Sequence, residues 1–148
     1  MNGKERVHCA LRREIPDVVP TFEWFIDAAV GETLTGSRDP LEIVARLDLD
    51  GINIRPDYSK RRLDEKTLVD EWGVERQLTD DVLPALRASP VADITRHREY
   101  AFPDPAAAHR FTALEAALEL FGDSKAVVLN LRDGFSDMRD LLGYQEAL

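Results

Sequence analysis

The sequence predicts an α/β fold in a single domain, and three observations favour it. First, helical and extended patterns alternate along 148 residues, a length that fits one domain of common size with a real hydrophobic core. Second, residues 125–135 are apolar on both faces, as is typical of a parallel strand covered by helices. Third, polar residues follow the predicted strands, and strand ends form the active face of parallel α/β proteins.

Composition and charge narrow the class of protein. The chain carries 28 acidic and 19 basic side chains, and its net charge of −9 argues against nucleic acid as the main partner, because phosphate binding needs clustered cations. The densest basic cluster, Lys60 to Arg62, is more typical of a solvated loop than of a phosphate site, although a lone anionic substrate could use it.

The sequence also indicates where in the cell the protein is located. The longest apolar runs are far too short to span a bilayer, so we expect no membrane partner. The first residues lack the apolar core of a signal peptide. A single cysteine forms no internal disulfide, which agrees with a reducing compartment. We therefore expect a cytoplasmic protein.

The first predicted elements are short. Residues 4–13 place apolar side chains at helical spacing and predict an amphipathic opening helix. Residues 18–25, VVPTFEWF, are rich in β-branched and aromatic side chains and predict a first strand, with Glu23 near its end. Residues 28–34 predict a short helix that Gly36 closes.

The next helix begins with strong signals. Asp39 is suited to the N-cap and Pro40 to the first helical position, and the apolar pattern continues to about Leu47. A strand at residue 51 follows at once. Because the connection after the first strand is long enough to return the chain to a parallel neighbour, the first sixty residues predict a βαβ unit.

The strand that begins at Gly51 is the centre of the functional prediction. In GINIRPDYS, residues 51–59, the isoleucines supply β-branched packing, and Pro56 removes a ladder donor and ends the strand. Asp57 and Tyr58 therefore stand at the end of the strand, and Asp57 is the candidate catalytic residue. The alternative is structural, because an Asp after a proline is more often a turn former or a helix cap than a catalyst.

Beyond this strand the pattern changes. Residues 65–80 predict an insertion in which two extended pieces meet near Trp72 and Gly73, as a hairpin or a kinked strand. Residues 80–105 hold several prolines and little periodicity, and they predict a long loop. Within a compact domain such a loop is expected to be functional or to lie over a surface.

Order returns in the last third of the chain. Asp104 and the proline after it predict a helix start, and an apolar stripe continues to Gly122, which ends the helix. The strand over 125–135 comes next. Residues 136–142 then predict a last helix, which Gly143 interrupts.

The sequence lacks the motifs of several classes of enzyme. The sequence has no phosphate-cradling GxxxxGK, no GxGxxG and no GxSxG. The three histidines, at positions 8, 97 and 109, are far apart, so we expect no metal site in this chain, although distant ligands can converge on folding.

The remaining candidates are polar residues at strand ends. Beside Asp57, the substrate-binding candidates are Glu23 after the first strand, Tyr58 after the second, and Arg132 and Asp133 after the third. For Arg132 and Asp133 the alternative is a local ion pair and a helix cap, which we weigh evenly with function.

Five stretches of the chain, taken together and in their order, are more specific for a protein family than any one of them alone. They are RVHCALRREIPDVVPTFEWF, DPLEIVARLDLDGINIRPDYS, VDEWGVE, YAFPDP and AVVLNLRDGFSDMRDLLGY. In this order they resemble the N-terminal half of the uroporphyrinogen decarboxylase superfamily. That superfamily includes the decarboxylase of haem synthesis and the corrinoid-linked methyltransferases, and its fold is a TIM (β/α)8 barrel.

The resemblance implies that this chain is the N-terminal portion of a barrel. A closed TIM barrel takes ~250 residues, so 148 residues are too few to close one. The open edge would expose backbone and apolar surface. We therefore expect self-association into a homo-oligomer, or docking onto a missing half-barrel.

For the decarboxylase branch, the resemblance implies a role for Asp57. An Asp after the second strand of that branch stabilises the protonated pyrrole while CO2 leaves, without a cofactor, and Asp57 matches its position. That branch also has an arginine-rich segment of the form RQAGRY, which grips propionate groups. Here the segment is EWFIDAAVGE, without arginine, so a polycarboxylate substrate would lose its charge-assisted partners.

For the methyltransferase branch, the resemblance implies a zinc ion held by His and Cys residues of the C-terminal half. That zinc activates a thiol to accept a methyl group from a corrinoid protein. Cys9 is not in a matching position, so no cofactor is expected in this chain itself. Residues 22–26 and the VDEWG segment are more similar to this branch.

Three hypotheses follow. The first is a fragment of a methyltransferase-like enzyme that acts with a small-molecule or corrinoid-protein substrate. The second is a tetrapyrrole decarboxylase. The third is a non-catalytic binding or assembly subunit that uses an open sheet edge.

Overall fold

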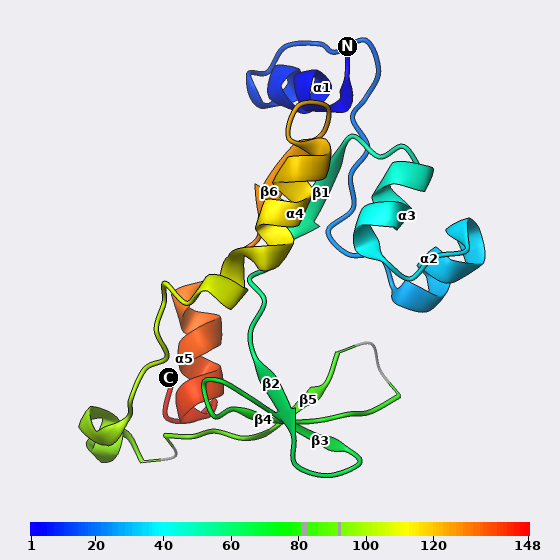
Figure 1. Ribbon diagram of the computed structural model, residues 1–148. Coiled ribbons are helices and arrows are strands. Elements are labelled where there is room, and N and C mark those ends of the chain that lie inside the picture. Colours follow the sequence, from blue (N-terminus) through cyan, green and yellow to red (C-terminus); the bar gives the residue numbers. More distant parts are fainter. Residues whose placement is uncertain (81–82, 92) are drawn as a thin grey trace. The chain divides into compact units, whose positions relative to one another are not determined.

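The computed structural model describes residues 1–80, 83–91 and 93–148, and it has a mixed α/β fold (Figure 1). The chain divides into two compact units. The first unit comprises Met1–Pro56 and Phe111–Asn130, and the second comprises Asp57–Arg110 and Leu131–Leu148. A two-stranded parallel sheet and a four-stranded antiparallel sheet are present, and no barrel closes within the described residues.

The first unit is built on two parallel strands. Strand β1, Gly51–Ile54, pairs with β6, Ala126–Leu129, in a register that sets Gly51 opposite Ala126. Helix α4, Thr112–Phe121, packs against both strands. The buried core consists of Val44, Ile52, Ile54, Ala117 and Phe121. Strand, helix and parallel strand thus form a βαβ unit.

Gly51 is needed for the close approach of these strands. A β-carbon at this position would lie 2.9 Å from the carbonyl oxygen of Ala126 and 3.3 Å from its β-carbon. Any side chain would therefore push the two backbones apart.

The N-terminal helices of the first unit confirm the capping signals of the sequence. They are α1, Gly3–Leu11, α2, Ala28–Thr35, and α3, Pro40–Arg46. Asp39 caps α3 by accepting hydrogen bonds from the backbone N–H groups of Leu41 and Glu42, at 2.8 and 3.0 Å. Gly36 ends α2 in the left-handed conformation, with φ of 77°.

The predicted first strand over residues 18–25 was wrong, because these residues form no strand. The segment runs beside β1 through isolated bonds: Thr21 accepts the N–H of Asp50 at 2.7 Å, and Glu23 accepts the amide of Asn53 at 3.0 Å. Pro20 lacks an N–H to continue a ladder. The βαβ unit over the first sixty residues was therefore also wrong, since the parallel partner of β1 is β6.

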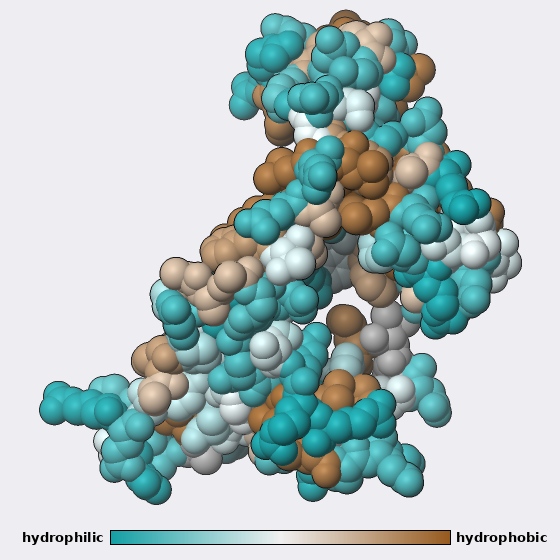
Figure 2. All heavy atoms as spheres, in the orientation of Figure 1, coloured by the Kyte–Doolittle hydropathy of each residue, from teal (hydrophilic) through white to brown (hydrophobic). Residues whose placement is uncertain are grey.

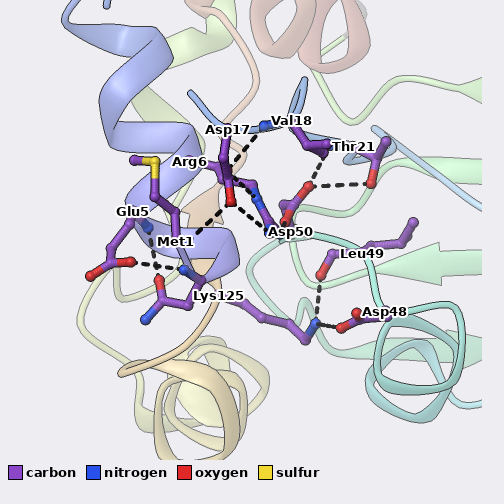
Figure 3. A network of polar contacts seen from close by, with 11 residues as sticks. Met1, Glu5, Arg6, Asp17, Val18, Thr21, Asp48, Leu49, Asp50 and Lys125 are labelled. Atoms are coloured by element: carbon purple, nitrogen blue, oxygen red, sulfur yellow. Dashed lines mark hydrogen bonds and ion pairs between the residues drawn. The ribbon is translucent and has the colours of Figure 1, made fainter. Parts of the chain in front are cut away.

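A buried carboxylate ties α1 to this segment (Figure 3). Asp50, 4% exposed, accepts hydrogen bonds from Arg6 at 3.0 Å and from the N–H of Thr21 at 2.7 Å. Burial alone would raise the pKa of Asp50, but these bonds outweigh burial and lower it. Arg6 also pairs with Asp17 at 2.8 Å, so one guanidinium joins the helix to two distant carboxylates.

The second unit contains an antiparallel sheet in the order β2-β3-β4-β5. The strands are β2, Lys60–Arg62, β3, Thr67–Asp70, β4, Glu75–Gln77, and β5, Ala85–Ala88. Two 3₁₀ helices follow, η1, Ile94–Glu99, and η2, Ala108–Phe111, and the last helix is α5, Gly134–Leu142.

The predicted hairpin around Trp72 and Gly73 is confirmed, because β3 and β4 pair antiparallel across it. The Asp70 carboxylate forms the turn by accepting the N–H groups of Trp72 and Val74, at 3.0 and 3.1 Å. Gly73 follows with φ of 79°, a conformation that glycine adopts without strain.

Three other predictions for this region need correction. Lys60–Arg62 is an exposed strand and not a loop. The predicted loop over 80–105 contains β5 and η1, whereas its positions 81, 82 and 92 lie outside the described residues. The helix expected from Asp104 begins later, at Thr112 after η2, because Asp104 instead closes a local turn with the N–H of Ala106 at 2.9 Å.

The C-terminal elements agree with the sequence. The strand predicted within 125–135 is β6, and Gly122 caps α4. Helix α5 ends at Gly143, as expected. The N–H of Val91 donates to the carbonyl of Leu141 at 3.0 Å and so attaches α5 to the segment after β5.

Apolar residues reach the surface of both units among the hydrophilic ones (Figure 2). Trp24 is 59% exposed in the first unit, and Phe102 is 68% exposed in the second. Among the helices of the described residues, none is long and apolar enough to cross a membrane.

Candidate functional site

The residues that follow β1 lie against two other segments of the second unit. The N–H of Asp57 donates to the carbonyl of Arg110 at 3.2 Å. The N–H of Glu71 donates to the carbonyl of Ser59 at 2.9 Å. Backbone hydrogen bonds therefore bring the PDYS segment, the VDEWG turn and the end of the 100–110 segment together.

Arg110 lies at the centre of this arrangement and its side chain is only 6% exposed. Its guanidinium carbon lies 5.2 Å from the ring centre of Tyr58 and 5.4 Å from that of Trp72, so two aromatic rings flank the cation. Cation–π contacts of this kind stabilise a desolvated guanidinium. The Arg110 cluster consists of Arg110, Tyr58, Glu71, Trp72 and His109.

The charge of Arg110 is balanced, but its hydrogen bonds are incomplete. Nη2 lies 2.9 Å from Oε2 of Glu71, which is an ion-pair distance without hydrogen-bond geometry. Within the described residues, neither Nε nor Nη2 has a hydrogen-bond partner, and both atoms are buried. A buried donor without a partner costs about 1–3 kcal/mol, and more when it is charged.

Glu71 is shared between two basic side chains. Its Oε1 lies 3.3 Å from Nε2 of His109, while its Oε2 faces Arg110. Glu71 is 13% exposed, whereas His109 is 40% exposed. The carboxylate therefore lies between a buried cation and an imidazole that reaches solvent.

Aromatic rings extend the cluster. Tyr58 and Trp72 contact edge to face with centres 6.4 Å apart, and Phe102 continues the row 6.3 Å from Trp72. The Tyr100 hydroxyl donates to the carbonyl of Trp72 at 2.6 Å. Burial raises the pKa of Tyr58, and the nearby charge of Asp137 adds to the effect, so the phenol remains protonated at neutral pH.

A second polar cluster surrounds Asp140, which is 4% exposed. Its carboxylate accepts hydrogen bonds from Arg76, from Arg132 at 2.6 Å and from Arg139 at 3.0 Å. Burial alone would raise the pKa of Asp140, but the bonds from Arg132 and Arg76 outweigh burial and lower the pKa to about 2. The cluster joins β4 to α5 and has a structural role.

Asp133 and Arg132 have local roles of the kind the structural alternative predicted. Asp133 caps α5, since its carboxylate accepts the N–H of Ser136 at 2.8 Å and the Ser136 hydroxyl at 3.0 Å. Arg132 pairs with Asp140, and at 3.4 Å with Asp137. Its side chain remains 34% exposed, so part of it stays accessible to solvent.

The five site residues predicted from the sequence are divided between the two units. Asp57, Tyr58, Arg132 and Asp133 belong to the second unit, and Glu23 belongs to the first. Glu23 is exposed and contributes its carbonyl, not its carboxylate, to the contact with Asn53. The Asp57 side chain is also exposed, and no hydrogen bond or ion pair joins its carboxylate to another of the described residues.

Sequence reasoning missed Arg110 and Glu71. Neither stands at the end of a predicted strand, and a buried arginine has no local sequence signature. The VDEWG stretch was noted for its resemblance, and it contains Glu71 and Trp72. Two acidic residues beside a tryptophan at a hairpin turn were the one available signal.

Metal ligands do not gather in the described part of the chain. No group of three or more His, Cys, Asp or Glu side chains lies close enough there to hold a metal ion. Compared with protein families, with curated proteins and with solved structures, the chain matches none of them.

Proposed function

We propose that this chain is the N-terminal portion of an enzyme of the uroporphyrinogen decarboxylase superfamily. In this proposal it supplies the first strands of a TIM barrel, and it supplies Asp57 to the active site. The observation that carries the proposal is the βαβ unit of β1, α4 and β6, since a TIM barrel is a repetition of such units. The order of the five resembling stretches supports it independently.

Strand ends support the position of the active site in this proposal. Asp57 and Tyr58 follow the carboxyl end of β1, and Arg132 follows that of β6, its parallel neighbour. Catalytic groups of TIM barrels come from the carboxyl ends of several strands. The exposed Asp57 carboxylate is free of partners among the described residues and is available to a substrate.

Within the superfamily we favour a methyltransferase that acts with a corrinoid partner. Support comes from residues 22–26 and from the VDEWG stretch, whose Glu71 and Trp72 belong to the Arg110 cluster. In such a transfer the cobalt–carbon bond breaks, a carbon–sulfur bond forms with a thiolate, and the electron pair stays on cobalt. The zinc that would activate the thiol is expected in sequence beyond this chain.

The test is methyl transfer by the protein isolated from its native cells, with methylcobalamin and 2-mercaptoethanol as probes. We expect thioether formation and loss of the methylcobalamin absorption. Asp57→Asn should slow the reaction by about tenfold or more, the usual loss when a positioned polar group is removed. The matched control is Asp123→Asn, an exposed carboxylate elsewhere in the chain. Equal rates in the two variants would exclude the role of Asp57.

The second candidate is cofactor-free decarboxylation of a tetrapyrrole. The unpaired carboxylate of Asp57 favours it, because a free carboxylate can accept hydrogen bonds from pyrrole N–H groups. Release of CO2 from uroporphyrinogen, lost in Asp57→Asn, would establish this activity in place of methyl transfer. If neither substrate reacts, both candidates fail.

A further inference from the structure

The unpaired edge of Arg110 is the feature that the proposed function does not use. Nε and Nη2 lie on the same edge of the guanidinium, and this edge forms the two parallel bonds of a bidentate contact with a carboxylate. Both atoms are buried and lack hydrogen-bond partners among the described residues, although the side chain is 6% exposed. A buried cation with its binding edge unpaired points to a ligand anion.

We propose that the Nε and Nη2 edge of Arg110 binds the carboxylate of a small organic ligand, which replaces Glu71 as the partner of the guanidinium. The inference rests on the proposed function for the reaction that follows. Binding itself is measurable without catalysis.

Glu71 is suited to be displaced. Its carboxylate lies 2.9 Å from Nη2 but makes no hydrogen bond there, so it neutralises the charge without making either hydrogen bond of the fork. Its other oxygen already lies 3.3 Å from Nε2 of His109, which reaches solvent and offers a second hydrogen-bond partner. A ligand carboxylate that makes both charge-assisted bonds would satisfy donors that Glu71 leaves unpaired.

Two aromatic side chains lie beside the guanidinium. Tyr58 and Trp72 both lie within cation–π distance of its central carbon, and the backbone carbonyl of Trp72 accepts a hydrogen bond from the Tyr100 hydroxyl. Because these rings also provide apolar contact beside the fork, we expect a carboxylate attached to a flat ring to bind better than acetate. Benzoate is therefore the probe, and neutral benzamide is its matched control.

Trp72 makes the binding observable. The chain has two tryptophans, and Trp24 lies in the first unit. In the Trp24→Phe variant of this 148-residue chain, Trp72 is the sole tryptophan. We expect benzoate to change its fluorescence in a saturable manner, and benzamide at equal concentration and ionic strength to have no such effect.

Two substitutions test whether Arg110 binds a ligand or only has a structural role. Arg110→Lys should weaken benzoate binding by about tenfold or more, since an ammonium has no fork. Glu71→Gln should tighten binding severalfold, because it removes the competing carboxylate, and this variant keeps Arg110 if Arg110→Lys fails to fold. Circular dichroism and a urea titration check the fold of each variant.

The proposal is overturned by any of three results. These are no saturable response to benzoate in either the Trp24→Phe protein or its Glu71→Gln derivative, an equal response to benzamide, or weaker binding after Glu71→Gln. Saturable benzoate binding without methyl transfer would support the ligand site at Arg110 and exclude the proposed reaction. Methyl transfer without benzoate binding would support the proposed reaction and exclude the ligand site.

Discussion

Buried charges in this chain are compensated to different degrees. Asp50 and Asp140 are surrounded by donors, and both have lowered pKa values despite burial. Arg110 has a counter-ion in Glu71 but two unpaired donors. Since an unmade hydrogen bond in the interior is costly, the two aspartates have structural roles and Arg110 is the group poised to bind.

The pH dependence of stability tests the role of Asp140. Its folded pKa of about 2 lies below the ordinary value of 3.8, so its stabilising effect is present above about pH 4 and is lost as pH falls toward 2. Asp140→Asn should therefore be less stable than wild type at pH 5, and the gap should shrink by at most about 2 kcal/mol toward pH 2, with solvent screening of the arginines included. Urea unfolding from pH 5 downward measures it.

Asp137 supplies the control of opposite sign. Burial raises the pKa of this carboxyl, although Arg132 partly opposes the rise. Ionisation of Asp137 therefore disfavours the fold, and Asp137→Asn should gain stability relative to wild type at pH 5 and lose that gain at low pH. The same trend in both variants would contradict these assignments.

Gly51 tests the spacing of the parallel pair. Gly51→Ala would bring a β-carbon to 2.9 Å from a backbone oxygen, and we expect it to lower the free energy of unfolding by about 1–3 kcal/mol. Gly134→Ala is the control, because a β-carbon there meets nothing within 4 Å. An equal effect in both variants, measured by urea unfolding, would count against the close approach of β1 and β6.

At the scale of elements, signals carried by a few adjacent residues predict well. Asp39 and Gly36 fix helix ends because a cap or a left-handed turn depends on one residue and its neighbours. Residues 18–25 failed because strand propensity needs burial and a paired neighbour. Val19 is 80% exposed, and Pro20 interrupts the donors.

Pairing between strands was less predictable than the strands themselves. The sequence indicates strands near 51 and 126. Their pairing joins two segments that residues 57–110 of the second unit separate along the chain. Periodicity reports which residues are buried and not what they are buried against. The predicted βαβ unit was therefore wrong, because the parallel partner of β1 is β6 and not residues 18–25.

The cap of α5 gives a prediction at this scale. Asp133→Ala should lower the urea midpoint, because the N–H and hydroxyl of Ser136 lose their acceptor. Asp133→Asn should retain most of the stability, since asparagine is also a good N-cap. An unchanged midpoint in Asp133→Ala would contradict the capping role of this residue.

At the scale of the whole molecule, only some residues of the candidate site could be predicted from the sequence. Asp57 and Tyr58 were found because a proline ends the strand before them. Arg110 and Glu71 reach them through antiparallel pairing and backbone bonds between distant segments, which leave no local pattern. The sequence therefore did not predict the buried ion pair of Arg110 and Glu71.

The barrel proposal assigns the parallel sheet to the barrel and the antiparallel sheet to an insertion. One βαβ unit supplies two parallel strands, and the antiparallel sheet lies between them in sequence. A full barrel requires ~250 residues. The barrel proposal therefore requires further sequence to complete the fold and the active site.

The measurement that tests this claim most directly is the intact mass of the protein as it occurs in its native cell. We expect a mass well above 16.7 kDa, the mass of these 148 residues. The zinc ligands and the thiol site should then be sought in the added sequence. A measured mass of 16.7 kDa would contradict the barrel proposal and leave the chain as a binding subunit.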